Sequence, residues 1–192
     1  MKKIPTLFVR EFENHKPVSI KPELTSESLR WVLDGEGTAT EKVDGSCCAI
    51  IDGKFYRRYD AKKGKQPPAY AIPCDDPDPI TGHWPHWVPV KEDDPASKWY
   101  IEAKKYTENQ KELEDGTYEA IGPHFQGNPY QLAWDMLVRH GRAVLSVERS
   151  FEGIRDYLQG NYIEGIVFWK DGEPKCKIKR SDFGFRWGVR KD

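Results

Sequence analysis

Two Asp-Gly pairs constrain the fold of this chain more than any other feature. Asp52-Gly53 and Asp171-Gly172 each stand between two strand-like segments. The flanking segments are 47–51 and 54–59 for the first pair, and 165–169 and 175–179 for the second. An Asp-Gly pair in this setting is the strongest short-range signal for a two-residue hairpin turn. The sequence therefore predicts two β-hairpins, whose strands must pair antiparallel.

The other expected elements alternate irregularly between strand and helix. We expect strands at 6–10, 117–121 and 143–147, and helices at 26–33, from 128 to about 139, and at 151–158. Segment 96–114 is either a helix or a strand followed by a helix, and we favour a helix in its second half. Segment 66–94 is rich in Pro, Asp and Trp without a sustained period, which predicts a long irregular insertion. Hairpins without regular β–α–β alternation favour an α+β domain in which helices flank an antiparallel sheet.

Length and composition limit the class of protein. A chain of 192 residues suits one domain, so we expect residues 1–192 to fold as a single unit. No apolar run approaches 18 residues, and the basic start is not followed by a signal-type apolar core. The four cysteines form no C-x-x-C pair. We expect an intracellular, cytoplasmic protein with reduced thiols and no membrane partner.

The net charge of −1 hides a segregation of charge along the chain. Lysine and arginine gather in 54–65 and 170–191, whereas acidic residues gather in 75–78, 92–94 and 108–115. If the two basic segments meet in the fold, they form a face that attracts phosphate. Either segment alone is as readily explained as solvated surface charge.

The segment Glu41-Lys42-Val43-Asp44-Gly45 runs directly into the first hairpin. A neutral lysine amine at such a place can attack phosphorus, so nucleotidyl transfer is the first reaction to consider. A Lys-x-Asp-Gly string also occurs by chance in roughly one chain of this size in twenty, and a surface turn is the alternative. The motif needs support from elsewhere in the chain.

Three further positions supply that support. Glu119 lies in the expected strand 117–121, and Glu164 stands just before the strand 165–169. Lys177 and Lys179 alternate along the last strand, so period-two geometry places both on one face. The Asp171-Gly172 turn brings this lysine pair next to the strand that follows Glu164.

In this order, the motifs resemble those of the covalent nucleotidyltransferase superfamily, which contains ATP-dependent DNA and RNA ligases and mRNA capping enzymes. The resemblance runs from about residue 38 to 184. Within it, 39–48, 82–85, 127–130 and 164–167 are similar to the small 5′-to-3′ RNA ligase family known from vertebrates. It implies an antiparallel nucleotidyltransferase, or adenylation, domain. We expect no C-terminal OB domain, because few residues follow Lys179.

The resemblance implies roles for the catalytic residues. Lys42 attacks the α-phosphorus of ATP as a neutral amine, a state that nearby cations or partial burial favour. Lys177 and Lys179 supply those cations and neutralise the phosphate in the transition state. Asp44 orients the phosphate, the lysine or the metal shell.

The resemblance also implies an ATP site. Glu41 reads the adenine amino group and Thr40 lines the same pocket, while Arg58 contacts ribose or phosphate. Glu119 holds the ribose hydroxyls, and Glu164 helps to position Mg²⁺ or Mn²⁺. No aromatic residue in 143–147 can stack on adenine, so Val144 is the candidate for that contact.

RNA is expected to lie along a basic groove. The candidates for this groove are Arg57, Lys62, Lys63 and Arg180. Trp84 and Trp87 either stack on exposed bases or, as we favour, pack the insertion onto the domain. His83 and His86 lack further ligands at suitable spacing, which favours structural histidines over a metal pair.

The sequence therefore predicts an ATP-dependent RNA ligase of RNA repair. It would join 5′-phosphate and 3′-hydroxyl RNA ends through a lysine–AMP intermediate and an adenylylated 5′ end, with no obligate protein partner. A DNA ligase, a GTP-using capping-type enzyme and a non-catalytic nucleotide-binding module remain alternatives. Many DNA ligases carry arginine where this chain has Cys47, which favours the RNA ligase. The sequence leaves open whether the RNA substrate is a nick, a hairpin break or free ends.

Overall fold

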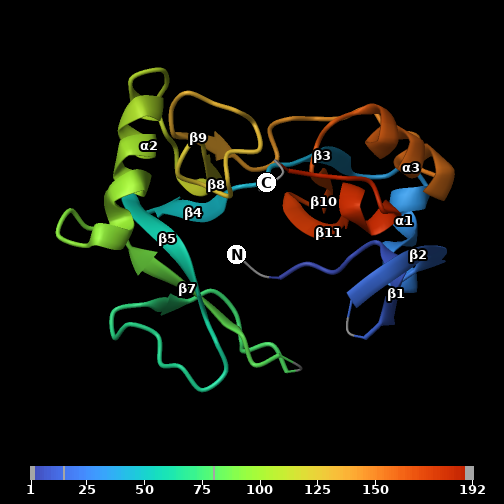
Figure 1. The fold of residues 1–192 in the computed structure, drawn as a ribbon, viewed down its shortest axis with the longest axis horizontal. Coiled ribbons are helices and arrows are strands. Elements are labelled where there is room, and N and C mark those ends of the chain that lie inside the picture. Colours follow the sequence, from blue (N-terminus) through green and yellow to red (C-terminus); the bar gives the residue numbers. More distant parts are fainter. Residues whose placement is uncertain (1–2, 15, 80, 189–192) are drawn as a thin grey trace. The chain divides into compact units, whose positions relative to one another are not determined.

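The computed structural model describes residues 3–14, 16–79 and 81–188. Arg190 and Lys191, at the end of the second basic segment, lie outside the described residues. The chain divides into two compact units, each of which combines antiparallel strands with short helices (Figure 1). The first unit holds Lys3 and residues 44–140, and the second holds residues 4–43 and the chain from 141 onward.

The first unit is built on a six-stranded antiparallel sheet in the order β6-β7-β5-β4-β8-β9. Its strands are β4 (Ser46–Ile51), β5 (Lys54–Ala61), β6 (Ile72–Pro73), β7 (Trp84–Pro89), β8 (Gly116–Ile121) and β9 (Met136–Arg139). A 3₁₀ turn, η2 (Pro95–Ser97), leads into the helix α2 (Lys98–Glu108). Ala103 of α2 packs in one core cluster with Cys48, Tyr118 and Leu137, so the helix covers β4, β8 and β9.

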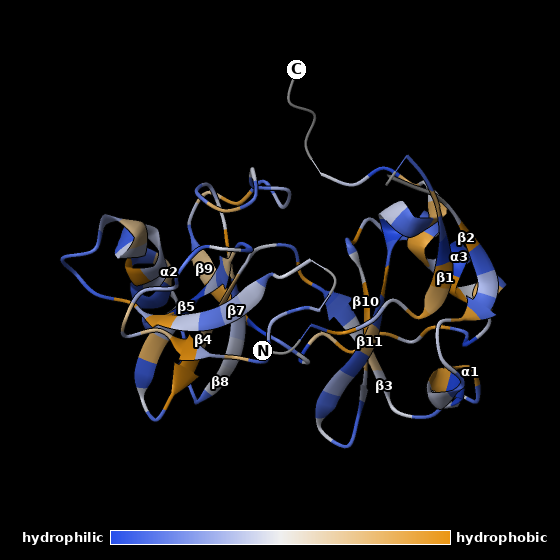
Figure 2. Cartoon of the chain, turned by 90° about the horizontal axis from the view of Figure 1, so that it is seen from below, coloured by the Kyte–Doolittle hydropathy of each residue, from blue (hydrophilic) through white to orange (hydrophobic). Residues whose placement is uncertain are grey.

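The strand β4 is buried on both faces. Cys48 and Ile50 point to the core under α2, whereas Ala49 packs on the other face with Tyr56 and Trp87. This two-sided burial explains why the segment reads as an unbroken apolar run rather than an alternating one. The same run gives β4 its apolar colour in Figure 2.

The predicted hairpin at Asp52-Gly53 is confirmed. Both residues have positive φ, 49° and 71°, as a type I′ turn requires. The carboxylate of Asp115 accepts hydrogen bonds from both turn amides, at 2.7 and 3.0 Å. The turn therefore satisfies its backbone donors with a side chain from the start of the adjoining strand.

The second unit contains a three-stranded antiparallel sheet in the order β11-β10-β3 and a separate hairpin β1-β2. Its elements are β1 (Phe8–Glu13), β2 (Lys16–Leu24), η1 (Glu27–Leu29), α1 (Arg30–Leu33), β3 (Thr38–Lys42), α3 (Phe151–Gly160), β10 (Gly165–Lys170), β11 (Glu173–Lys179) and η3 (Arg180–Phe183). The predicted hairpin at Asp171-Gly172 joins β10 to β11, again with both turn residues at positive φ. Ile166 and Ile178 point from the sheet into a core shared with Ile154 of α3.

Helices predicted at 26–33 and 151–158 are present, but two other helix predictions are wrong. Residues 128–135 form an irregular loop and 136–139 form β9. Asn128 takes a positive φ of 54°, and its side chain hydrogen-bonds both backbone groups of Leu132, which closes the loop. In 96–114 the helix occupies the first half rather than the second. It begins early because Asp94 caps η2, with its carboxylate accepting from the Ala96 amide.

Strand predictions also need correction. The segment 66–94, expected to be irregular, contains the strands β6 and β7, and β7 pairs with β5 along its whole length. Segment 143–147 contributes a single bridge, between Val144 and Thr40, instead of a strand. Thr6 likewise makes a lone bridge to Lys177, and the strand begins at Phe8. Among the described residues, no helix has both the length and the apolar character needed to cross a membrane.

Candidate active site

Glu164 is the centre of a charge cluster in the second unit. It lies directly before β10 and is 5% exposed. Lys42 Nζ donates to its Oε2 at 2.6 Å, and Lys179 Nζ donates to its Oε1 at 2.8 Å. One buried carboxylate thus holds two ammonium groups from two different strands, and each of its oxygens carries a charged hydrogen bond.

The sheet register explains how both lysines reach Glu164. Gly165 of β10 lies between Lys42 on β3 and Lys179 on β11. A Cβ at Gly165 would stand 2.2 Å from the carbonyl oxygen of Ile178. Only glycine therefore fits between these strands without displacing backbone, which gives the Glu-Gly motif a physical reason.

Lys177 adds a third ammonium group to this face of the sheet. It lies two residues before Lys179 on β11, and Val167 separates it from β3. Burial, together with the positive charges of Lys42 and Lys179, lowers its pKa to about 8, although Glu164 acts in the opposite direction. The cluster is therefore rich in positive charge, with one carboxylate among three lysines.

The same sheet face continues past the lysines to an apolar edge. Thr40 is buried, and its hydroxyl accepts a hydrogen bond from Trp169 Nε1 at 2.8 Å. Val144 bridges to Thr40 and is 66% exposed. Glu41 pairs with Ile166 on the opposite face, where burial raises the pKa of its carboxyl group. The second unit thus brings Thr40 and Val144 to the face of the lysine cluster, whereas Glu41 lies on the other face of the sheet.

Glu119 lies in the first unit, on β8, in a different kind of site. His140 Nε2 lies 3.0 Å from Oε1 of Glu119, and His140 Nδ1 lies 2.8 Å from the hydroxyl of Thr117. Oε2 of Glu119 is buried and has no hydrogen-bond partner among the described residues. Sequence reasoning missed His140, because a lone histidine after an expected helix carries no signal that it meets a strand carboxylate.

Asp44 and Gly45, the last two residues of the Lys-x-Asp-Gly motif, are held within the first unit. The backbone amide of Asp44 donates to the hydroxyl of Tyr130 at 2.7 Å. A Cβ at Gly45 would lie 2.4 Å from the carbonyl oxygen of Ala120 on β8. The glycine of the Lys-x-Asp-Gly motif therefore allows a close backbone approach, and Tyr130 is a second residue whose role sequence reasoning missed.

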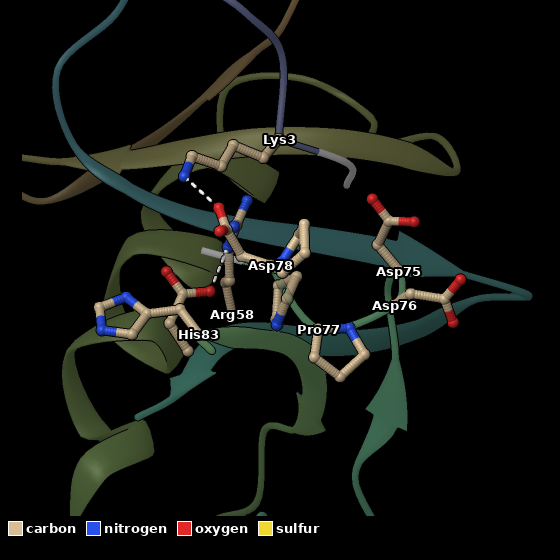
Figure 3. A pocket seen from close by; sticks show the side chains of 10 residues that line it. Lys3, Arg58, Asp75, Asp76, Pro77, Asp78 and His83 are labelled. Atoms are coloured by element: carbon tan, nitrogen blue, oxygen red, sulfur yellow. Dashed lines mark hydrogen bonds and ion pairs between the residues drawn. The ribbon is translucent and has the colours of Figure 1, made fainter. Parts of the chain in front are cut away.

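Arg58 faces a pocket of about 440 Å³ in the first unit (Figure 3). Its Nε donates to Asp60 at 2.8 Å, and burial, which lowers its pKa, is outweighed by this carboxylate. The other acidic residues of the lining are Asp75, Asp76 and Asp78, and Lys3 pairs with Asp78. The lining is dominated by carboxylates, so a phosphate in this pocket would depend on Arg58.

The candidate RNA-binding residues differ in accessibility. Arg57 is 16% exposed and pairs with Asp94 at 3.1 Å. Arg180 donates to the backbone carbonyls of Arg186 and Asn161, both at 2.8 Å. Lys62 and Lys63 are exposed. Two of the four candidates, Arg57 and Arg180, are thus engaged in contacts within the protein.

The aromatic and histidine residues of the insertion pack against the first unit. Trp87 is 7% exposed in a core cluster, and Trp84 Nε1 donates to the carbonyl of Asp75 at 2.7 Å. His86 is buried, whereas His83 lines the pocket of Figure 3. In the part of the chain that the structure describes, no three His, Cys, Asp or Glu side chains group as metal ligands.

No protein-family model matches the chain. Among known proteins it is similar to RNA ligase 1 of Rattus norvegicus, with 26% identity over 97% of this chain and 82% of the relative. RNA ligase 1 of Danio rerio is 26% identical over 79% of this chain and 68% of the relative. RNA ligase 1 of Pongo abelii is 24% identical over 98% and 82%. The similarity is weak in each case, but it is consistent and extends over most of the chain.

Proposed function

We propose that this protein is an ATP-dependent RNA ligase with a covalent nucleotidyltransferase fold, formed by residues 1–192 as one domain and acting in the cytoplasm. The observation that carries the proposal is the cluster of Lys42, Lys177 and Lys179 around Glu164. A nucleophilic lysine among cations suits chemistry at a phosphate, because the cations favour both the neutral amine and the phosphate charge.

In the first step, the amine of Lys42 attacks the α-phosphorus of ATP. A nitrogen–phosphorus bond forms while the bond from the α-phosphorus to the oxygen of the leaving pyrophosphate breaks. The attacking nitrogen, positively charged after the bond forms, releases one proton to solvent. Lys42 pairs with Glu164 at 2.6 Å, so this pairing must loosen before the amine can become neutral. Lys177 and Lys179 then face the phosphate oxygens and stabilise the charge of an in-line transition state.

Two further displacements complete the reaction. AMP passes from Lys42 to the 5′-phosphate of an RNA end, and a 3′-hydroxyl then displaces AMP and seals the strand. Each step exchanges one bond to phosphorus for another, so positioning and cationic stabilisation supply most of the acceleration. One cluster can therefore serve all three steps.

Glu164 is the residue that fits a divalent cation. Mg²⁺ is commonly bound by one or two carboxylates together with substrate phosphates and water, so a single carboxylate suits Mg²⁺ or Mn²⁺ beside ATP. When bound, the cation neutralises phosphate charge. Each oxygen of Glu164 pairs with one lysine and keeps a second lone pair, so a cation would share this carboxylate with Lys42 and Lys179.

We propose further contacts to ATP. Val144 offers an exposed apolar surface to adenine beside Thr40, and we also assign Glu41 to adenine through the strand that it shares with Thr40. The free oxygen of Glu119 suits a ribose hydroxyl donor. We also assign Arg58 to ribose or phosphate, and Asp44 to the phosphate, lysine or metal shell. Lys62 and Lys63 are the accessible members of the proposed basic groove, to which we also assigned Arg57 and Arg180.

Label transfer from α-labelled ATP tests the first step. We expect radioactivity to join the protein in the presence of Mg²⁺ and to map to a peptide containing Lys42. GTP in a parallel reaction should not label it, whereas labelling by GTP would favour a capping-type enzyme. ATP binding without any covalent label would reduce the protein to a nucleotide-binding module.

The polymer is tested with matched substrates. Nicked RNA, single-stranded RNA and nicked DNA, each with a 5′-phosphate and a 3′-hydroxyl, are offered to the adenylylated protein. We expect joining of RNA and little joining of DNA. If nicked DNA is sealed as well as RNA or better, the protein would be a DNA ligase and not the proposed RNA ligase.

A further inference from the structure

An exposed group of aromatic rings lies on the first unit, outside the candidate active site. Trp99 of α2 stacks on His124 with ring centroids 3.3 Å apart and planes within 7°. Tyr106 of α2 stacks on Trp134 at 6.0 Å and 19°. Trp134 is 61% exposed and Trp99 is 36% exposed. We call these four residues the aromatic surface.

The aromatic surface is a connected structure and not a set of isolated rings. Trp99 and Tyr106 are seven residues apart on one helix, so they lie on the same face about 10 Å from each other. The imidazole of His124 bonds the carboxylate of Asp135, whose chain neighbour is Trp134. The ring positions are therefore fixed by α2 on one side and by the His124–Asp135 bond on the other.

Folding of the first unit does not account for this exposure. The core beneath α2 is filled by other residues, among them Ala103 and Phe125. Trp134 leaves most of its large apolar surface in water, and grouped exposure of this kind is typical of an interaction site. Lys98 places its ammonium group 4.3 Å from the centre of the Trp99 ring. The surface thus offers an exposed ring at Trp134 and a cation held over the ring of Trp99.

This chemistry favours a nucleic acid over a protein as the occupant. Rings held in fixed planes next to a lysine match the way proteins bind single strands, by base stacking and backbone charge. Protein interfaces, by contrast, are depleted in lysine. The tryptophans of the insertion do not compete for this role, because Trp87 is buried and Trp84 is bonded to the backbone.

We propose that the aromatic surface binds single-stranded RNA, with a base stacked on Trp134 and a phosphate near Lys98. The inference rests on the proposed function, because it supplies the RNA contact of that ligase. It predicts that strand ends presented as unpaired bases are preferred over blunt duplex ends, since only unpaired bases can reach a ring face.

Equilibrium binding of a fluorescent, 5′-phosphorylated single-stranded RNA tests the inference without ligation. We expect Trp134→Ala to weaken binding about tenfold, the size of one lost stacking contact. Trp134→Phe should restore most of the affinity, whereas Trp134→Leu, which keeps apolar area without an aromatic face, should not. Phe12→Ala, at a residue 59% exposed on β1 of the second unit, is the matched control and should bind as the wild type does.

The outcomes separate this inference from the proposed function. Lys42 labelling with unchanged RNA affinity in Trp134→Ala would overturn the inference alone. If RNA affinity depends on Trp134 but the protein never takes up label from ATP, only the proposed ligase function would be overturned. Full affinity in Trp134→Leu, or a change in sedimentation mass on Trp134→Ala with no change in RNA binding, would show that a protein contact occupies the surface and would also overturn the inference.

A second measurement concerns Lys98. If it neutralises one phosphate, Lys98→Gln should reduce the salt dependence of binding by about 0.7 in the log–log slope. An unchanged slope would remove the phosphate contact from the proposal.

Discussion

The polar sites of the two units are built on opposite plans. In the second unit, one carboxylate, that of Glu164, lies among the ammonium groups of Lys42, Lys177 and Lys179. In the first unit, the carboxylate of Glu119 meets only His140, and one of its oxygens has no partner among the described residues. The first arrangement suits a ligand of several negative charges, and the second suits a hydroxyl or amide donor.

The backbone around the two sites follows one plan. Gly45 and Gly165 each allow a strand to approach a carbonyl oxygen at a distance that no Cβ tolerates. In both motifs the glycine is therefore a packing requirement, while its polar neighbours carry the chemistry. The difference between the units lies in side-chain charge and not in the way the strands meet.

The largest expected effect belongs to Lys42. Lys42→Met removes the proposed nucleophile, so label transfer from ATP should fall by at least about a thousandfold, as expected for loss of a covalent catalyst. Lys170→Met, which removes a lysine paired with Glu36 elsewhere on the same sheet, is the control and should retain labelling. If Lys42→Met still takes up label and the label maps to Lys177, the nucleophile would be Lys177 on β11 and not Lys42.

The second-largest effect is expected at Gly165, where the strands approach each other closely. Gly165→Ala places a methyl group against the Ile178 carbonyl, so we expect a loss of about 2–3 kcal/mol in the free energy of unfolding. Gly160→Ala at the end of α3 meets nothing within 4 Å and should be neutral or slightly stabilising. Urea denaturation measures both, and an equally stable Gly165→Ala protein would show that the strands can separate at no cost.

Local sequence determined the parts of this structure that depend on short-range chemistry. The two Asp-Gly hairpins were predictable because both turn residues take the positive φ that these residue types tolerate. The shared face of Lys177 and Lys179 followed from strand periodicity alone. These elements place Glu164 next to Lys179 with little need for distant contacts.

Other parts depend on contacts that no local pattern records. Lys42 and Glu164 are 122 residues apart, so only the resemblance to a known family suggested that they belong to one site. Asn128-Pro129 reads as a helix start, yet Asn128 closes a loop onto Leu132, and β9 forms because β8 offers it a free edge. Pro85 and Pro89 made β7 look irregular, although the neighbouring strands β5 and β6 hold it in the sheet.

Glu119 tests the role of the carboxylate oxygen that has no partner among the described residues. Glu119→Gln keeps the shape and removes one acceptor, so we expect the KM for ATP in label transfer to rise about tenfold with a smaller change in kcat. Glu102→Gln on α2 is an exposed control and should change neither constant. A fall in kcat at unchanged KM would instead place Glu119 in the chemical step.

The smallest expected effect concerns the charge of Lys177 in the cluster around Glu164 and its influence on the free energy of unfolding. The pKa of Lys177 is about 8 in the folded protein and roughly 10.4 in an unfolded chain. Its charged form is therefore disfavoured by folding, and the unfolded state binds more protons between these two values. Stability of the wild type should rise with pH across this window and should be lower below pH 8.

Lys177→Met removes this unfavourable charge, so at pH 7 the variant should be more stable than the wild type by about 1 kcal/mol while losing activity. The advantage should shrink as pH rises from 8 to 10, which urea denaturation at pH 7 and pH 9.5 can measure. Lys175→Met, on the same strand and paired with Glu173 at the surface, should differ from the wild type by less than about 0.5 kcal/mol at both pH values. A wild type that is more stable than Lys177→Met at pH 7 would mean that Glu164 compensates all three lysines. The two units would then differ in which side chains surround the carboxylate and not in net electrostatic repulsion. The three lysines of the second unit would not destabilise the folded protein, so a bound phosphate would have no repulsion between them to reduce.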